Sequence, residues 1–181
     1  MQDTTNKQYA IAVSTCREIF LNKSRDYGTS WRVYRMISIA DQIFIKANRI
    51  RTIQEKGSQK IDDDILGEFR GIFNYGIMGL IQLDHASDLE TPDFETEILQ
   101  HIYEQKAELA RKLMEDKNHD YGEAWRSMSQ ESFADLILAK ILRIKQIISN
   151  KGVTLISEGI DANLYDILNY SIFALILATP D

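Results

Sequence analysis

The sequence KNHDYGEAWR occupies residues 117–126, and a close copy, KSRDYGTSWR, occupies residues 23–32, 94 residues earlier. The lysine, the Asp-Tyr-Gly triplet and the Trp-Arg pair recur, while the residues between them differ. Further matches at the same offset are Asp41 with Asp135, Lys46 with Lys140, Arg49-Ile50 with Arg143-Ile144 and Ile53 with Ile147. After a one-residue shift, Asn74-Tyr75 matches Asn169-Tyr170. The chain is therefore a tandem repeat, with units at about residues 1–90 and 91–181 and a linker at 84–91.

The spacing of apolar residues predicts an all-α fold. Apolar side chains recur at three- and four-residue intervals, which is typical of amphipathic helices, and no stretch alternates as a strand would. We expect six helices, at residues 7–24, from about 29 or 31 to 56, from the aspartates 62–64 to 83, from Thr91-Pro92 to the second motif, at 130–150 and at 158–178. Glycine favours the left-handed conformation at helix ends, so Gly28 is expected to end the first helix.

Each unit of three helices is too small to bury a large core by itself. The chain is 44% apolar, so we expect the units to pack on each other as a single globular domain with pseudo-twofold symmetry. Close helix contact would explain four glycines in the third helix, Gly67, Gly71, Gly76 and Gly79. The buried stripe of the fourth helix is predicted to be Phe94, Ile98, Ile102, Leu109 and Leu113. A homodimer is also compatible with this sequence.

The formal net charge is −6, and the second unit carries the excess. Residues 1–90 hold 12 basic and 12 acidic side chains, and residues 91–181 hold 9 and 15. An acidic chain without a basic stripe argues against duplex nucleic acid as a partner. Small phosphorylated ligands remain compatible with it.

The single cysteine, Cys16, excludes an internal disulfide and is expected to pack in the core. The polar N-terminus does not resemble a signal peptide. The most apolar run, residues 167–179, is shorter than the roughly 20 residues that span a bilayer and predicts a buried helix. We therefore expect a cytoplasmic protein without a membrane partner.

Acidic residues of the last helix form a candidate Mg²⁺ site. Asp166, Asn169 and Tyr170 share a helical face, and Asp161 lies on the other side of Asn169. Carboxylates flanking an amide on one helix wall supply the oxygen ligands that Mg²⁺ takes. An ordinary capped helix, whose Asn and Tyr hydrogen-bond to the other repeat, is the alternative. The matching positions 66 and 71 are Leu and Gly, so repeat two is the expected home of a metal.

Basic and aromatic residues recur in both units. Lys140 and Arg143, like Lys46 and Arg49, need partners on an otherwise apolar helix. A phosphate, or a structural ion pair with Asp120 or Asp135, would satisfy them. Four aromatic residues, Tyr27, Trp31, Tyr121 and Trp125, offer either surfaces for a base or core packing. Asp26 and Asp120 could simply cap helices.

The spaced motifs Lys-x-x-Asp-Tyr-Gly-x-x-Trp-Arg, Lys-x-x-Arg-Ile and Asp-x-x-Asn-Tyr resemble the nucleotide modification associated domain family. This resemblance covers most of both repeats and implies a role in nucleotide metabolism or base modification. More distantly, the chain is similar to the all-α nucleoside triphosphate pyrophosphohydrolases of the MazG and dimeric dUTPase class. Those enzymes bind Mg²⁺ through a Glu-Glu-x-x-Glu and a Glu-x-x-Asp motif, and the complete pair of motifs is not present in this sequence.

Three hypotheses follow: a Mg²⁺-dependent nucleotide pyrophosphohydrolase, a module that binds nucleotides without turnover, and a structural helical repeat. For the first, the candidate catalytic residues are Asp120, Asp161 and Asp166, with Asp161 and Asp166 as metal ligands. The candidate ligand-binding residues are Lys117, Tyr121, Trp125, Arg126, Lys140, Arg143, Asn169 and Tyr170 in repeat two, and Lys23, Asp26, Tyr27, Trp31, Arg32, Lys46, Arg49, Asn74 and Tyr75 in repeat one.

Overall fold

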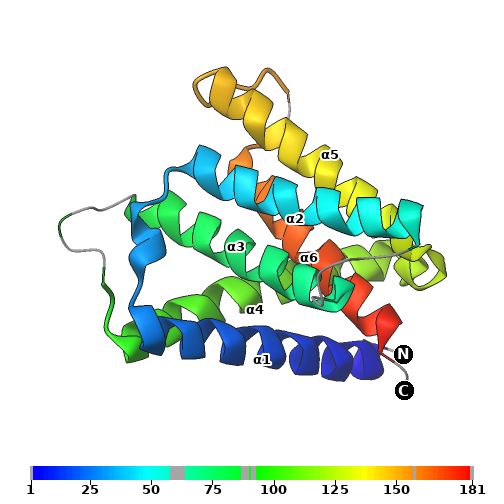
Figure 1. Ribbon diagram of the computed structural model, residues 1–181. Coiled ribbons are helices and arrows are strands. Elements are labelled where there is room, and N and C mark those ends of the chain that lie inside the picture. The colour runs from blue at the N-terminus through cyan, green and yellow to red at the C-terminus, as the bar shows by residue number, and fades with distance from the viewer. Residues whose placement is uncertain (1, 58–63, 87–89, 91–92, 157, 180–181) are drawn as a thin grey trace.

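The computed structural model describes residues 2–57, 64–86, 90, 93–156 and 158–179 (Figure 1). In these ranges the chain is helical and contains no strand, which confirms the all-α prediction. The α-helices are α1 (Gln2–Tyr27), α2 (Met36–Lys56), α3 (Ile65–His85), α4 (Thr96–Tyr121), α5 (Gln130–Ser149) and α6 (Ile160–Ala178), and the 3₁₀ helices are η1 (Ser30–Val33) and η2 (Ala124–Ser127).

Equivalent helices of the two repeats pack on each other. The α3 helix contacts α6, α2 contacts α5, and α1 contacts α4. Figure 1 shows these pairs as successive levels, with α1 and α4 at the bottom and α2 and α5 at the top. Because each helix meets its own counterpart, the arrangement is that of two helical repeats related by a pseudo-twofold axis.

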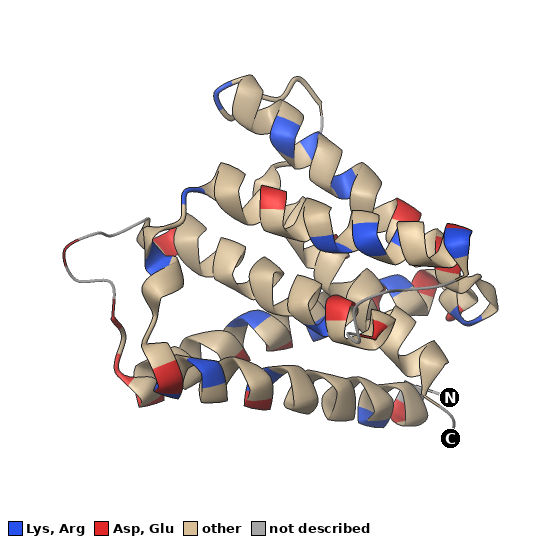
Figure 2. Ribbon diagram, viewed as in Figure 1, with Lys and Arg blue, Asp and Glu red and all other residues tan. Residues whose placement is uncertain are grey.

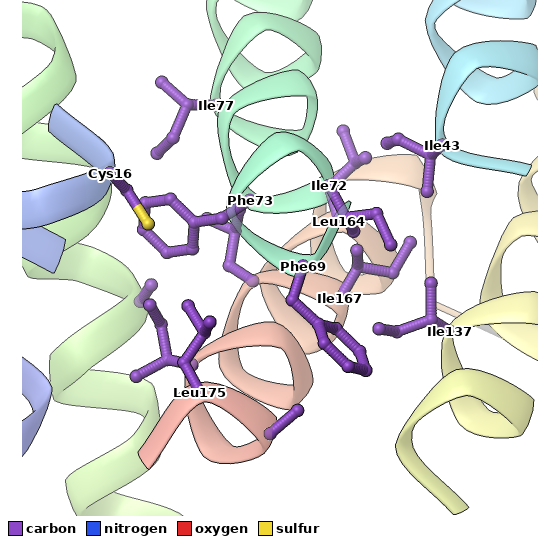
Figure 3. Close-up of a cluster of buried hydrophobic side chains, with 14 of the residues drawn as sticks. Cys16, Ile43, Phe69, Ile72, Phe73, Ile77, Ile137, Leu164, Ile167 and Leu175 are labelled. Carbon is purple, nitrogen blue, oxygen red and sulfur yellow. The ribbon is translucent and has the colours of Figure 1, made fainter. Parts of the chain in front are cut away.

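The centre of the molecule lies where α3 crosses α6. A methyl group added at Gly76 would come within 2.6 Å of Leu168, and one at Gly79 within 3.0 Å of Leu164. These two glycines therefore permit the close helix contact that was predicted for them. Figure 3 shows the apolar side chains of α1, α2, α3, α5 and α6 that surround this contact, among them the fully buried Cys16.

The repeated Asp-Tyr-Gly triplet ends one helix in each repeat. Gly28 and Gly122 follow α1 and α4 with φ angles of 64° and 62°, in the left-handed region that glycine adopts without strain. The prediction of one continuous helix from residue 29 or 31 to residue 56 is wrong. The chain instead forms η1 and then extends at Tyr34 and Arg35 before α2 begins. The short turn places two adjacent residues, Trp31 and Arg32, in the interior.

The predicted buried stripe of the fourth helix is wrong at three of its five positions, whereas Phe94 and Ile102 are partly buried against the core. Three of its members, Ile98, Leu109 and Leu113, are 47%, 46% and 39% exposed. The face that packs inward lies one residue further along and consists of Leu99, Tyr103, Ala107, Ala110 and Met114. The sequence pattern failed here because alanines and a tyrosine form the inner face, while larger aliphatic residues remain outside.

Some predicted helix ends are revised by the structure. Asp64 caps α3, its side chain accepting a hydrogen bond from the Gly67 amide, as the acidic run predicted. Asp62 and Asp63, like the proposed start of the fourth helix at Thr91-Pro92, lie outside the described residues. Residues 93–95 are not helical, so α4 begins later than predicted, at Thr96.

Within the described ranges, α6 alone is long and apolar enough to cross a membrane by length and composition. However, 67% of its apolar window is buried against the rest of the protein. It serves as a central core helix, as the sequence predicted.

Candidate functional site

Each copy of the repeated motif borders a cavity at the junction of the first and third helices of its repeat. The cavity in repeat one, here called the repeat-one pocket, has a volume of about 340 Å³, and its counterpart, the repeat-two pocket, about 210 Å³. Equivalent positions line both cavities: Lys23 and Lys117, Tyr27 and Tyr121, Trp31 and Trp125, Asn74 and Asn169, and Tyr75 and Tyr170. The structure therefore brings together much of the predicted site, once in each repeat.

The two asparagines also link the repeats. Asn74 Nδ2 donates to the Cys16 carbonyl in its own repeat (3.0 Å), and Asn74 Oδ1 accepts from the Tyr103 hydroxyl of the other repeat (2.8 Å). Symmetrically, Asn169 Nδ2 donates to the Ala110 carbonyl (3.1 Å) and Asn169 Oδ1 accepts from Tyr9 (2.8 Å). These bonds match the alternative in which the asparagines hydrogen-bond across the repeats.

Tyr9 and Tyr103 are the partners that sequence reasoning missed. Both are buried, and burial raises the pKa of each hydroxyl. A signal was present, since the two tyrosines are separated by the same 94 residues as the repeated motif.

The two arginines that close the motifs are engaged in structural contacts. Arg32 donates to Gln82 and to the His85 carbonyl, and its guanidinium lies over the Phe94 ring at 4.9 Å. Arg126 donates to Glu123, Thr5 and Gln8, and lies over the Trp125 ring at 4.4 Å. Neither arginine lines its pocket, so both hold the turn in place.

The tryptophans combine core packing with an unpaired polar atom. Trp31 is 7% exposed and Trp125 is 6% exposed, as expected for core residues. Among the described residues, neither indole N–H has a hydrogen-bond partner, and an unpaired buried donor costs about 1–3 kcal/mol. Trp125 stacks face to face on Phe173 at 4.2 Å, so this ring face is already covered in repeat two.

In repeat two the pocket contains its own ion pairs. Asp166 Oδ1 accepts from Lys117 (2.5 Å) and Oδ2 from Lys140 (2.6 Å). Burial alone would raise the pKa of Asp166, but the hydrogen bonds from the two lysines outweigh it and hold the pKa below its ordinary value. The pKa of Lys117 is raised, because its bond to Asp166 outweighs the effect of burial.

In repeat one the carboxylate lies one helical turn earlier. Glu68, equivalent to Asn163, pairs with Lys46 (3.0 Å) and with Arg49. Position 71, which corresponds to Asp166, is a glycine. The Lys46 side chain crosses it so closely that a methyl group there would lie 2.9 Å from its Cε. Lys46 thereby reaches the repeat-one pocket, whereas Lys140 does not line the repeat-two pocket.

The three candidate catalytic aspartates are not brought together. Asp161 is exposed, whereas Asp166 is buried, and five residues place the two about 140° apart around a helix. Asp120 is exposed and contacts the His119 ring at 3.1 Å. Within the described ranges no group of three or more His, Cys, Asp or Glu residues could hold a metal ion. Since both Asp166 oxygens already accept from lysines, these residues do not fit a Mg²⁺ site.

The remaining charged candidates lie outside the two pockets. Arg143 and Lys140 border a separate, open cavity between α5 and the residues before α6. Two equivalent ion pairs, Lys145–Asp41 (2.5 Å) and Arg51–Asp135 (3.3 Å), link α2 to α5, where Figure 2 shows basic residues recurring along both helices. Asp26 is exposed and does not line the repeat-one pocket.

Several residues that line the repeat-one pocket were not predicted as site residues, among them Arg70 and Tyr34. Arg70 lies four residues before Asn74 and so shares its helical face, which was a usable signal. Nothing in the sequence marked Tyr34, because its position depends on the bend between η1 and α2.

Comparison with protein families supports the resemblance read from the motifs. The model of nucleotide modification associated domain 1 matches residues 23–83 and again residues 117–177. No curated protein and no solved structure matches the chain, and a likeness to the all-α nucleoside triphosphate pyrophosphohydrolases is not shown. Each match begins at the lysine of the repeated motif, near the end of the first helix of its repeat, and covers the second helix and nearly all of the third. With two copies covering most of its length, the chain belongs to the nucleotide modification associated domain 1 family.

Proposed function

We propose that this protein binds a nucleotide, or a similar small molecule that joins a phosphate to a flat ring, in the repeat-one pocket. The observation that carries the proposal is the charge of the lining. Three basic side chains, Lys23, Lys46 and Arg70, line this pocket, and no carboxylate of the described residues does. In a protein with a net charge of −6, such a concentration of cations favours an anionic ligand.

Two of these cations are available to a ligand. Within the described part of the chain, Lys23 and Arg70 form no ion pair or hydrogen bond. The third cation, Lys46, is paired at 3.0 Å with Glu68, which does not line the pocket. A phosphate that entered between these groups would receive charge-assisted hydrogen bonds, which are stronger than bonds between neutral groups.

Aromatic side chains supply the second half of the recognition. The Tyr27 ring is 66% exposed at the edge of the pocket, and Tyr34 and Tyr75 also line it. A nucleobase can stack on such rings without a change of fold. The volume of about 340 Å³ lies at the lower end of the roughly 300–1,000 Å³ that ligand pockets occupy, which favours a mononucleotide over a longer ligand.

The placement of the carboxylates favours binding without metal-dependent hydrolysis. Asp166 is committed to Lys117 and Lys140, and Asp161 faces solvent elsewhere. Membership of the nucleotide modification associated family supports the choice of ligand class. Among the described residues, no group of three or more His, Cys, Asp or Glu side chains could hold the metal of a Mg²⁺-dependent pyrophosphohydrolase.

The test is isothermal titration calorimetry with a panel of nucleoside mono-, di- and triphosphates and the parent nucleosides. We expect at least one nucleotide to bind and its nucleoside to bind more weakly. Replacing Lys23 or Arg70 by glutamine should weaken binding about tenfold, the loss expected for one charge-assisted hydrogen bond. Lys112→Gln, at an exposed position of α4, is the matched control.

Chromatography of the ligand after incubation with Mg²⁺ separates binding from turnover. Intact nucleotide supports the binding role, and release of pyrophosphate would replace it by hydrolysis. Absence of binding by every compound at millimolar concentration would refute the proposed function.

A further inference from the structure

The two pockets differ at a position of the third helix that lies beside the lysines that recur in both repeats. Asp166 in repeat two corresponds to Gly71 in repeat one, at the offset of 95 that also relates the asparagines 74 and 169. The two lysines that grip Asp166 have counterparts too, since Lys117 corresponds to Lys23 and Lys140 to Lys46. Repeat one therefore retains both lysines and lacks the carboxylate between them.

We propose that the phosphate of the ligand lies above Gly71, between Lys23 and Lys46, where the Asp166 carboxylate lies in repeat two. The repeat-two pocket is accordingly closed to anions by its own aspartate, and each chain binds one ligand. This inference rests on the proposed function and adds the position of the phosphate and the number of sites.

Repeat two shows how an anion is bound at this position. One carboxylate oxygen accepts from Lys117 at 2.5 Å and the other from Lys140 at 2.6 Å. Each lysine comes from a different helix, α4 or α5, and the anion comes from α6. A phosphate group is also an anion, and its oxygens accept the same bonds, so a phosphate can take the place of the carboxylate in repeat one.

Gly71 allows the Lys46 ammonium group to reach this position. Without a side chain at this position, the Lys46 stem can cross the helix, within 2.9 Å of where a Cβ atom would stand, and reach the pocket. Glu68 does not replace the missing carboxylate, because it does not line the pocket and is shared between Lys46 and Arg49.

The parts of the two pockets that would hold the ring of the ligand also differ, and repeat one is again the more open. In repeat two Phe173 covers the Trp125 ring at 4.2 Å, and the pocket is about 130 Å³ smaller, the difference between 340 and 210 Å³. The counterpart of Phe173 is Met78, a flexible side chain that can yield to a ligand. Both differences make repeat one the open site.

The test exchanges the residue that distinguishes the repeats. Gly71→Asp introduces the repeat-two aspartate, which can pair with Lys23 and Lys46, and Gly71→Asn introduces a side chain of the same size without the charge. Circular dichroism establishes that both variants fold. Calorimetry with the best-binding nucleoside monophosphate is expected to give one site per wild-type chain, at least a tenfold loss for Gly71→Asp, and a loss at least threefold smaller for Gly71→Asn.

Two further probes locate the phosphate. Inorganic phosphate should compete with the nucleotide in the wild type and should not compete in Gly71→Asp. Asp166→Asn should leave the nucleotide affinity of the repeat-one site within twofold of the wild type, because Asp166 belongs to the other pocket.

The outcomes separate the two claims. Failure of the wild type to bind any nucleotide overturns the proposed function. A wild type that binds, together with unchanged affinity in Gly71→Asp, equal losses in both Gly71 variants or a stoichiometry of two, overturns the phosphate position alone.

Discussion

The hydrogen bond between Tyr9 and Asn169 allows a quantitative test of how the repeats are joined. Tyr9 is 1% exposed, and its hydroxyl donates to Asn169 Oδ1 at 2.8 Å across the interface between α1 and α6. Tyr9→Phe removes the donor and leaves the ring in place. Tyr103→Phe makes the same change at the symmetric bond to Asn74.

The expected cost follows from what each change leaves behind. A net hydrogen bond contributes about 1 kcal/mol, and a buried acceptor left unpaired costs about 1–3 kcal/mol. Asn169 borders the repeat-two pocket, from which water can reach its oxygen once the hydroxyl is gone. We therefore expect Tyr9→Phe to lower the free energy of unfolding by about 1–2 kcal/mol, in the lower part of that range.

Urea unfolding monitored by far-UV circular dichroism measures this loss. The midpoint should fall while the m-value stays constant, because the surface exposed on unfolding is unchanged. The melting temperature should fall by roughly 2–4 °C for each kcal/mol in a protein of this size. The control is Tyr121→Phe, since Tyr121 is 75% exposed, and it should stay within about 0.5 kcal/mol of the wild type. If Tyr9→Phe behaves like this control, the hydrogen bond does not join the repeats as described.

Three further predictions concern single positions. Asp166→Asn should destabilise the protein at pH 7 by about 1–3 kcal/mol, because Lys140 loses its partner. Folding lowers the pKa of Asp166, so the stability that its carboxylate contributes is lost as the pH falls through the pKa in the folded protein. Urea titrations at several pH values should show the variant and the wild type converging in stability below about pH 4. Gly28→Ala should cost at least about 1 kcal/mol more than Gly122→Ala in thermal unfolding. Both glycines have positive φ, but only at Gly28 would the new methyl group clash with the Asp93 carboxylate. Equal costs would contradict this. Cys16 should react with a thiol reagent only after unfolding, because it is fully buried and burial raises its pKa to about 12; rapid labelling of the folded protein would count against the packing shown in Figure 3.

The helical content could be predicted from the sequence because it depends on local spacing. The left-handed residues Gly28 and Gly122 and the cap at Asp64 are local as well, and they lie where the sequence placed them. The α4 face was misassigned because side-chain hydrophobicity does not show which face meets a neighbour. Leu109 and Leu113 are nearly half exposed, while Ala110 is fully buried against the other helices.

Only part of the candidate site could be predicted, because the sequence does not show which faces of the helices meet. Repetition identified Lys23, Lys46 and their counterparts, since a residue needed in both units appears twice. Repetition alone did not separate binding from structure, and Asn74 and Asn169 serve as cross-links between the repeats.

The sequence by itself determined the helical fold class, the end of the first helix at Gly28 and the duplication, because these follow from the order of apolar, polar and glycine residues along the chain. Only the tertiary structure decided how the polar side chains combine. Asp166 meets Lys117 and Lys140 from two other helices, whereas Gly71 leaves the equivalent place open. Ion pairing falls off with distance in space and not along the chain, so a difference of one residue between the repeats acquires its meaning only when three helices are brought together.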